Sequence, residues 1–129
     1  MIKKNKQKLI FGTASINQKY GIFYKKNNKL KILEKVIDNG IKSFDTAIDY
    51  NNDKILSKIF KYIDSKPIIY TKFNLNDFGQ NIIDKIEKHV ENRGVIPKYF
   101  LFREFKKKIR FEKVVDFISN NYKNSLLGV

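Results

Sequence analysis

The sequence has 129 residues, which is enough for one domain with a buried core. Hydrophobic residues make up 42% of it and aromatic residues 14%, so a mainly disordered chain is excluded. The 27 Lys and Arg residues outnumber the 13 Asp and Glu residues and give a net charge of +14. Cysteine is absent, which excludes a disulfide framework and a thiolate metal site, and we expect no other metal.

The positive charge has two interpretations. It would attract phosphate, on a nucleic acid or on a nucleotide cofactor. Alternatively, the lysines form solvated helix faces, which we favour because they are spread over every segment and no nucleic-acid-binding module is recognisable. No apolar run approaches the roughly 20 residues of a membrane span, and no secretory leader is visible. We therefore expect a cytoplasmic protein without membrane contact or specific nucleic-acid binding.

Short apolar segments alternate with segments of helical periodicity along the whole chain. The first strand is expected to end at Gly12, and the first helix is expected to begin at Asn28 and close at Gly40. The predicted strands cover residues 9–12, 43–45, 68–71, 99–102 and 126–129, and the predicted helices cover residues 28–40, 53–63, 81–92 and 111–121. This alternation indicates a parallel α/β sheet with right-handed crossovers.

Two parallel architectures fit this alternation. A doubly wound sheet normally has a G-x-G-x-x-G turn after its first strand, but this chain has the single Gly12 there. The pattern therefore favours an α/β fold of the (β/α)8 TIM-barrel type, ending after about the fifth strand. We expect residues 1–129 to form one partial barrel domain.

Three polar side chains are predicted at the carboxyl ends of neighbouring strands, where barrels carry their chemistry. Asp45 ends the second strand, Tyr50 follows it, and Lys72 ends the third. When a carbonyl carbon accepts hydride, its oxygen needs a proton, which a tyrosine can donate if a nearby cation lowers its pKa from about 10. Lys72 would be this cation, held by Asp45, so we expect their head groups within about 6 Å of one another.

Each of these residues also has an ordinary interpretation when taken alone. Asp45 could form a turn, Tyr50 could be a packing aromatic, and Lys72 could be one solvated lysine among many. Their order and spacing, however, resemble a known family. The segment from Gly40 to Tyr50, with Phe44-Asp45-Thr46-Ala47 at its centre, is similar to the signature of the aldo-keto reductases.

The resemblance runs from about Leu9 to Val129 and implies an NADPH-dependent oxidoreductase that reduces an aldehyde or ketone to an alcohol. It assigns Tyr50 as the general acid, with Lys72 and Asp45 as the pair that tunes it. The cofactor-binding residues that it implies are Gly12, Thr13, Ala14 and Asp45.

Two departures from the family pattern affect the expected activity. Arg103 stands where the family has a histidine that binds the carbonyl oxygen; arginine can donate to an oxyanion but stays cationic. The only histidine, His89, lies in a charged helix and is predicted to be a surface residue. Moreover, the family's strands six to eight, which hold much of the cofactor, have no counterpart in this sequence.

We therefore expect this chain to be inactive or strongly impaired by itself, unless a second chain completes the barrel. A non-catalytic barrel remnant or scaffold is the first alternative, and a basic nucleic-acid-binding module is the second.

Overall fold

A computed structural model describes residues 9–17, 26–74, 81–103 and 108–128. Within them, five strands form one sheet in the order β1-β2-β3-β4-β5, and every neighbouring pair is parallel. The strands are β1 (Ile10–Gly12), β2 (Ser43–Ala47), β3 (Ile68–Asn74), β4 (Tyr99–Arg103) and β5 (Leu126–Gly128). All five predicted strands are confirmed, although Val129, which the prediction included, lies outside the described residues.

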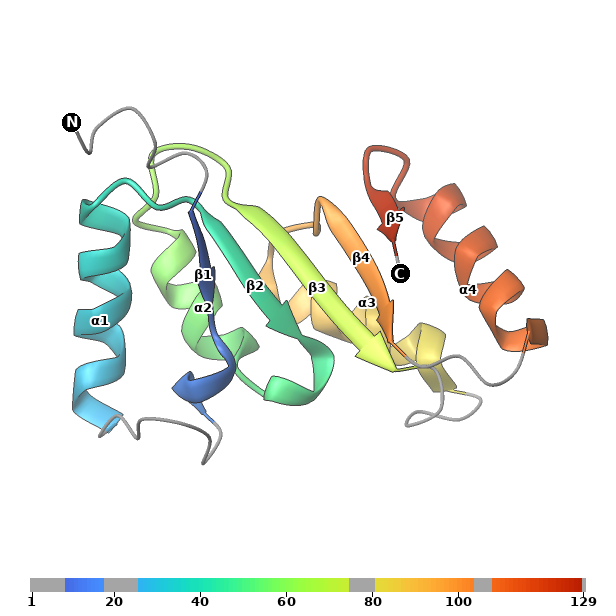
Figure 1. The fold of residues 1–129 in the computed structure, drawn as a ribbon, viewed down its shortest axis with the longest axis horizontal. Coiled ribbons are helices and arrows are strands. Elements are labelled where there is room, and N and C mark those ends of the chain that lie inside the picture. Colours follow the sequence, from blue (N-terminus) through green and yellow to red (C-terminus); the bar gives the residue numbers. More distant parts are fainter. Residues whose placement is uncertain (1–8, 18–25, 75–80, 104–107, 129) are drawn as a thin grey trace.

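Four α-helices connect the strands and cover one face of the sheet (Figure 1). They are α1 (Lys26–Asp38), α2 (Asp53–Phe60), α3 (Ile82–Arg93) and α4 (Lys108–Asn121). The predicted start of the first helix at Asn28 is wrong, because α1 already begins two residues earlier. The second helix ends before the predicted Ile63, since the chain turns after Phe60 and leaves Tyr62 75% exposed. No helix in the described parts of the chain is long and apolar enough to cross a membrane.

The core lies between the sheet and the helices, where alternate strand residues point toward the helices. On β3, for example, Ile69 and Phe73 are buried, whereas Ile68 is 40% exposed. One cluster joins β2 and β3 to α1 and α2, and the other joins β3 and β4 to α3 and α4. Burying this single apolar layer is the main force that fixes the helices on the sheet.

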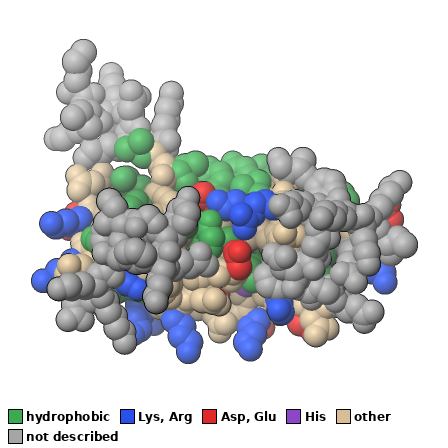
Figure 2. Space-filling view, turned by 60° about the horizontal axis from the view of Figure 1, so that its bottom comes forward, with side chains coloured by type: hydrophobic (Ala, Val, Ile, Leu, Met, Phe, Trp, Pro, Cys, Tyr) green, Lys and Arg blue, Asp and Glu red, His purple; other side chains and the backbone are tan. Residues whose placement is uncertain are grey.

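Among the described residues, no α-helix covers the opposite face of the sheet (Figure 1), and apolar side chains are exposed on it (Figure 2). Ile10 and Leu126 are 49% and 51% exposed, and the rings of Tyr70 and Tyr99 stack there at 4.4 Å. We refer to it as the open face. A strand as apolar as β3 is typical of a sheet buried on both sides, but within the described residues only the helix side is covered. In the part of the chain that the structure describes, β1 and β5 are the edge strands of the sheet, and each has one neighbouring strand.

Candidate active site

Asp45 and Lys72 form an ion pair on the open face. β2 and β3 are neighbours in register, and the two residues project from them on the side away from the helices. Lys72 Nζ lies 2.6 Å from Asp45 Oδ1 and 2.7 Å from Oδ2, so the ammonium contacts both carboxylate oxygens. The side chains are 21% and 38% exposed, which leaves the pair accessible from the open face. The distance expected from the sequence is therefore confirmed.

Tyr50 lies beside this pair. It ends the short 3-10 helix η3 (Ile48–Tyr50), which follows β2 directly. Lys72 Nζ is 5.9 Å from the centroid of the Tyr50 ring, within the range of a cation–π contact. Asn51 then adopts a left-handed conformation with φ of 52° and turns the chain toward α2. The loop after β2 thus places a phenol next to an ammonium held by the end of β3.

Arg103 reaches the same loop from the carboxyl end of β4. Its Nη2 lies 3.6 Å from Oδ2 of Asp49, the residue before Tyr50, and both side chains are about half exposed. At this distance and exposure the pair is weak, so the guanidinium can turn toward another anionic group. The strand ends of β2, β3 and β4 therefore bring two cations and a phenol to one edge of the sheet.

Gly12, at the end of β1, and the two residues that follow it have different surroundings. Gly12 pairs with Asp45 in register, and a Cβ added to it would meet no atom within 4 Å, so there is open space beside it. Thr13 is fully buried, and both its N–H and its hydroxyl donate to the Asp45 carbonyl oxygen at 2.9 Å. Ala14, half-buried, begins the 3-10 helix η2 (Ala14–Ile16). Gly12 thus borders the open face, while the Thr13 hydroxyl joins β1 to β2.

The prediction that His89 is a surface residue is wrong. Its side chain is only 2% exposed, because this position of α3 faces the sheet. Nδ1 lies 2.9 Å from Asp53 Oδ2, and Nε2 lies 2.8 Å from Thr71 Oγ1. Since the carboxylate accepts a hydrogen bond from Nδ1–H, the neutral ring can accept one from the Thr71 hydroxyl at Nε2.

Arg93 lies one turn further along α3 and is also buried. Its Nη2 donates to Asp53 Oδ1 and lies 3.4 Å from Thr46 Oγ1. We call Asp53, His89, Arg93, Thr46 and Thr71 the buried polar cluster. Nε and Nη1 of Arg93 are buried and have no hydrogen-bond partner within the described residues.

Asn52 extends this cluster toward β1. Its Nδ2 donates to the carbonyl oxygen and the hydroxyl of Thr13, at 3.1 and 2.9 Å, and its Oδ1 accepts from Thr46 at 3.2 Å. These bonds tie the start of α2 to β1 and β2. No pattern in the sequence predicted a structural role for Asn52 or for the cluster residues Thr46, Thr71, Asp53 and Arg93.

Burial sets the ionisation of the cluster. Burial lowers the pKa of His89, and the hydrogen bond from its ring to Asp53 offsets this only in part. Burial by itself raises the pKa of Asp53, but the hydrogen bond and charge of His89 and the charge of Arg93 outweigh it, so this pKa lies below its ordinary value of 3.8. Burial also lowers the pKa of Arg93, which stays cationic at neutral pH because guanidinium is so weak an acid. At pH 7 the cluster therefore contains a neutral imidazole between a carboxylate and a guanidinium.

These shifts predict that the chain loses stability on mild acidification. The folded state holds the pKa of His89 below 6.5, so the unfolded state binds more protons as pH falls through that value. The free energy of unfolding should fall by up to about 1.4 kcal/mol per pH unit as the pH drops below about 6.5. Besides Asp53 and Arg93, the charged groups beside His89 are those lining the adjacent cavity, namely Asp49, Lys85 and Lys88.

Urea unfolding at several pH values measures this effect. His89 is the only histidine in the sequence, so the slope in this range can be assigned to one side chain. The His89→Gln variant should lose the slope. The lowered pKa of Asp53 acts in the same direction, but only at more acidic pH, near and below 3.8. Equal stability of the unsubstituted chain at pH 5 and pH 7 would contradict the prediction.

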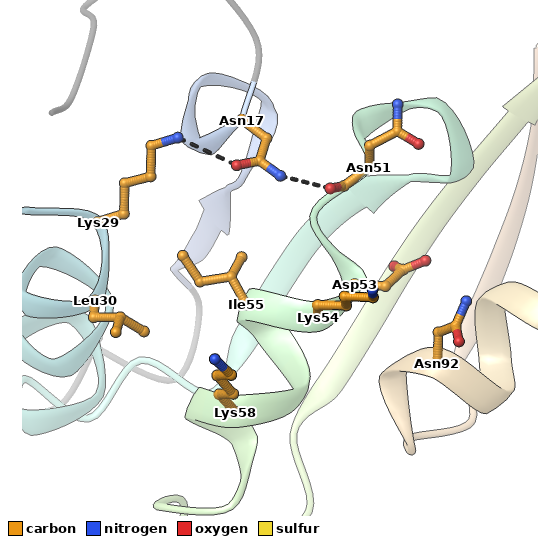
Figure 3. Close-up of a pocket in the computed structure, with 9 residues that line it drawn as sticks. All are labelled: Asn17, Lys29, Leu30, Asn51, Asp53, Lys54, Ile55, Lys58 and Asn92. Carbon is orange, nitrogen blue, oxygen red and sulfur yellow. Dashed lines mark hydrogen bonds between the residues drawn. The ribbon is translucent and has the colours of Figure 1, made fainter. Parts of the chain in front are cut away.

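A separate cavity of about 740 Å³ lies on the helix side (Figure 3). Asn17 bridges two of its walls, because its amide donates to the Asn51 carbonyl oxygen and accepts from Lys29. The lining residues are Asn17, Lys29, Leu30, Asn51, Asp53, Lys54, Ile55, Lys58 and Asn92. None of the three residues of the open-face site lines it, so we do not assign it to the candidate chemistry.

The fold and the site together define a class of protein. Parallel strands with helices on one face, and ionisable side chains gathered at the strands' carboxyl ends, are typical of an α/β barrel enzyme. The chain belongs to the aldo/keto reductase family, whose family model matches residues 8–118. No curated protein sequence matches it.

Solved aldo-keto reductases share the fold at low sequence identity. A thermostable aldo-keto reductase solved with the inhibitor epalrestat and a putative aldo-keto reductase from Pseudomonas aeruginosa are each 16% identical, with TM-scores of 0.69. One from Klebsiella pneumoniae, solved with NADPH, is 12% identical, with a TM-score of 0.61. Each match covers 92% of this chain and 46%, 52% and 42% of the respective relative. The chain thus spans about half the length of the solved relatives that it matches.

Proposed function

We propose that this chain forms the proton-donating half of an NADPH-dependent reductase that converts an aldehyde or ketone into an alcohol. The observation that carries the proposal is the contact of the Lys72 ammonium with both oxygens of Asp45, next to the ring of Tyr50. A half-buried phenol beside a cation that a carboxylate holds in place is a suitable general acid for a substrate oxygen. A non-catalytic remnant would have no need to keep all three groups together.

The chain's own residues would act on the carbonyl oxygen. The Tyr50 hydroxyl donates its proton to this oxygen as negative charge develops there. The Lys72 ammonium stabilises the resulting phenolate, and Asp45 holds the ammonium in place. Arg103, held only weakly by Asp49, supplies further N–H donors for the developing charge. The arginine makes a histidine unnecessary for this purpose, although its fixed charge would favour small or anionic substrates.

The open face fits the nicotinamide end of the cofactor. Gly12 lies beside Asp45 with open space where a side chain would stand, and the apolar side chains of Ile10 and Ile68 are exposed nearby. NADPH, when bound, supplies the hydride. Its phosphates need cationic side chains or clustered backbone N–H groups, which we propose come from additional barrel strands.

Those additional strands, on the same polypeptide or on a second one, are also part of the proposal. They would pair with the edges at β1 and β5 and cover the apolar open face. Closure would exclude water from the Asp45–Lys72 pair and strengthen its field at the carbonyl oxygen.

NADPH oxidation with a panel of small aldehydes and ketones tests the function. It should be measured for the 129-residue chain and for its fusion to the C-terminal half of the Pseudomonas aeruginosa relative. We expect turnover by the fusion and little or none by the chain alone, because the reacting atoms must be held within roughly 3–3.5 Å of one another. If a folded fusion binds NADPH but reduces no carbonyl compound, the proposal fails.

A further inference from the structure

The buried polar cluster lies directly behind the Asp45–Lys72 pair. Thr46 and Thr71, which follow Asp45 and precede Lys72 in the sequence, are register partners on β2 and β3. Because side chains alternate along a strand, the two threonines point toward the helices while the ion pair faces the opposite way. Every buried polar side chain of the described residues except Ser43 belongs to this cluster or to its extension through Asn52 and Thr13.

Each threonine hydroxyl is held by a residue of α3. His89 binds the hydroxyl of Thr71 at 2.8 Å, and Nη2 of Arg93 lies 3.4 Å from that of Thr46. His89 contacts Oδ2 and Arg93 contacts Oδ1 of the same carboxylate, that of Asp53 at the start of α2. One partly buried carboxylate, 16% exposed, thus connects two helices to two strands at the level of the ion pair.

Packing alone does not require such a cluster. The rest of the helix–sheet interface is apolar, and buried ion pairs can often be replaced by hydrophobic residues without loss of stability. What the polar cluster adds to the backbone ladder is direction, since hydrogen bonds from α3 fix the orientation of the Thr46 and Thr71 side chains more strictly than apolar contacts do. A small displacement of β3 against β2 would change the distance between the Lys72 ammonium and Asp45.

We infer that Asp53, His89 and Arg93 are positioning residues for the Asp45–Lys72 pair, acting through the hydroxyls of Thr46 and Thr71. The catalytic meaning of this inference rests on the proposed function, but the geometry of the pair can be tested without cofactor or substrate. His89 is the most informative position, because Nδ1 contacts Asp53 and Nε2 contacts Thr71, so each contact can be removed separately.

Acetylation of Lys72 in the native chain, followed by peptide mass spectrometry, reports on the pair. A lysine ammonium that is held by a carboxylate is acetylated slowly. The Asp45→Asn variant therefore gives the reference rate for a Lys72 side chain that has lost its carboxylate partner. Thr71→Val removes the hydroxyl without changing the shape of the side chain. We expect it to raise the Lys72 rate, relative to the exposed Lys113, by about fivefold, the change that loss of one buried hydrogen bond gives.

Two substitutions of His89 form a matched pair. Glutamine retains an acceptor where Nε2 contacts Thr71, whereas asparagine retains a donor only where Nδ1 contacts Asp53. We therefore expect His89→Asn to raise the Lys72 rate as Thr71→Val does, and His89→Gln, which keeps the contact with Thr71 and loses only that with Asp53, to raise it less. A cluster that contributes only stability would not distinguish the two amides in this way.

Val114→Ala is the control for general loss of stability, since Val114 is buried between α4 and the sheet, outside the cluster. It should leave the Lys72 rate unchanged. The inference is overturned if Thr71→Val leaves the Lys72 rate unchanged, or if Val114→Ala raises it equally. If the histidine variants do not fold, the comparison of Thr71→Val with Val114→Ala still decides the matter. Because the assay contains no NADPH, its failure is distinct from a failure to reduce carbonyl compounds.

Discussion

Replacing Tyr50 with phenylalanine is expected to lower the kcat of carbonyl reduction by the completed barrel by about 10²–10⁴-fold, the usual contribution of a general acid. The substitution removes the hydroxyl and leaves the ring against Lys72 in place. The KM for the carbonyl substrate should change much less, because the proton is transferred only as the transition state forms. Steady-state NADPH oxidation by the fusion and its Tyr50→Phe variant measures both constants.

Tyr62→Phe is a suitable control, since Tyr62 is 75% exposed after α2 and belongs to neither the open face nor the cluster. It should leave kcat unchanged. If Tyr50→Phe retained more than about a tenth of the activity, a group other than this phenol would be the proton donor. Arg103 would then be examined next, because its guanidinium reaches the same loop.

The Asp53→Ala substitution should reduce the free energy of unfolding by about 3–5 kcal/mol, which is typical when one partner of a buried ion pair is removed. Arg93 is fully buried, so it would keep its charge without a counterion, and His89 would lose the acceptor for Nδ1–H. Urea unfolding followed by circular dichroism measures the loss.

Two comparisons make this result specific. Asp116→Ala, at an exposed position on α4, should change stability by no more than about 0.5 kcal/mol. The double variant Asp53→Leu with Arg93→Met removes both charges, and it should be more stable than Asp53→Ala alone. A loss below about 1 kcal/mol for Asp53→Ala would mean that solvent reaches Arg93 and that the cluster is not a buried unit.

Local patterns in the sequence predicted most of the fold. Strand segments and helices appear in the predicted order, because alternating apolar runs and helical stripes depend on neighbouring residues alone. Two helix boundaries differ from the predicted ones, since α1 begins before Asn28 and α2 ends before Ile63. Helix ends depend on capping and tertiary contacts that the periodicity does not contain.

The sequence by itself also determined that Asp45 and Lys72 meet, since carboxyl ends of adjacent parallel strands share one edge of the sheet. The burial of His89 was decided only by the tertiary structure. The spacing of Ile82, Ile86, His89 and Arg93 places all four on one face of α3, but polar residues at such positions remain buried only when partners satisfy them. Those partners come from α2, β2 and β3, and no pattern within one helix could identify them.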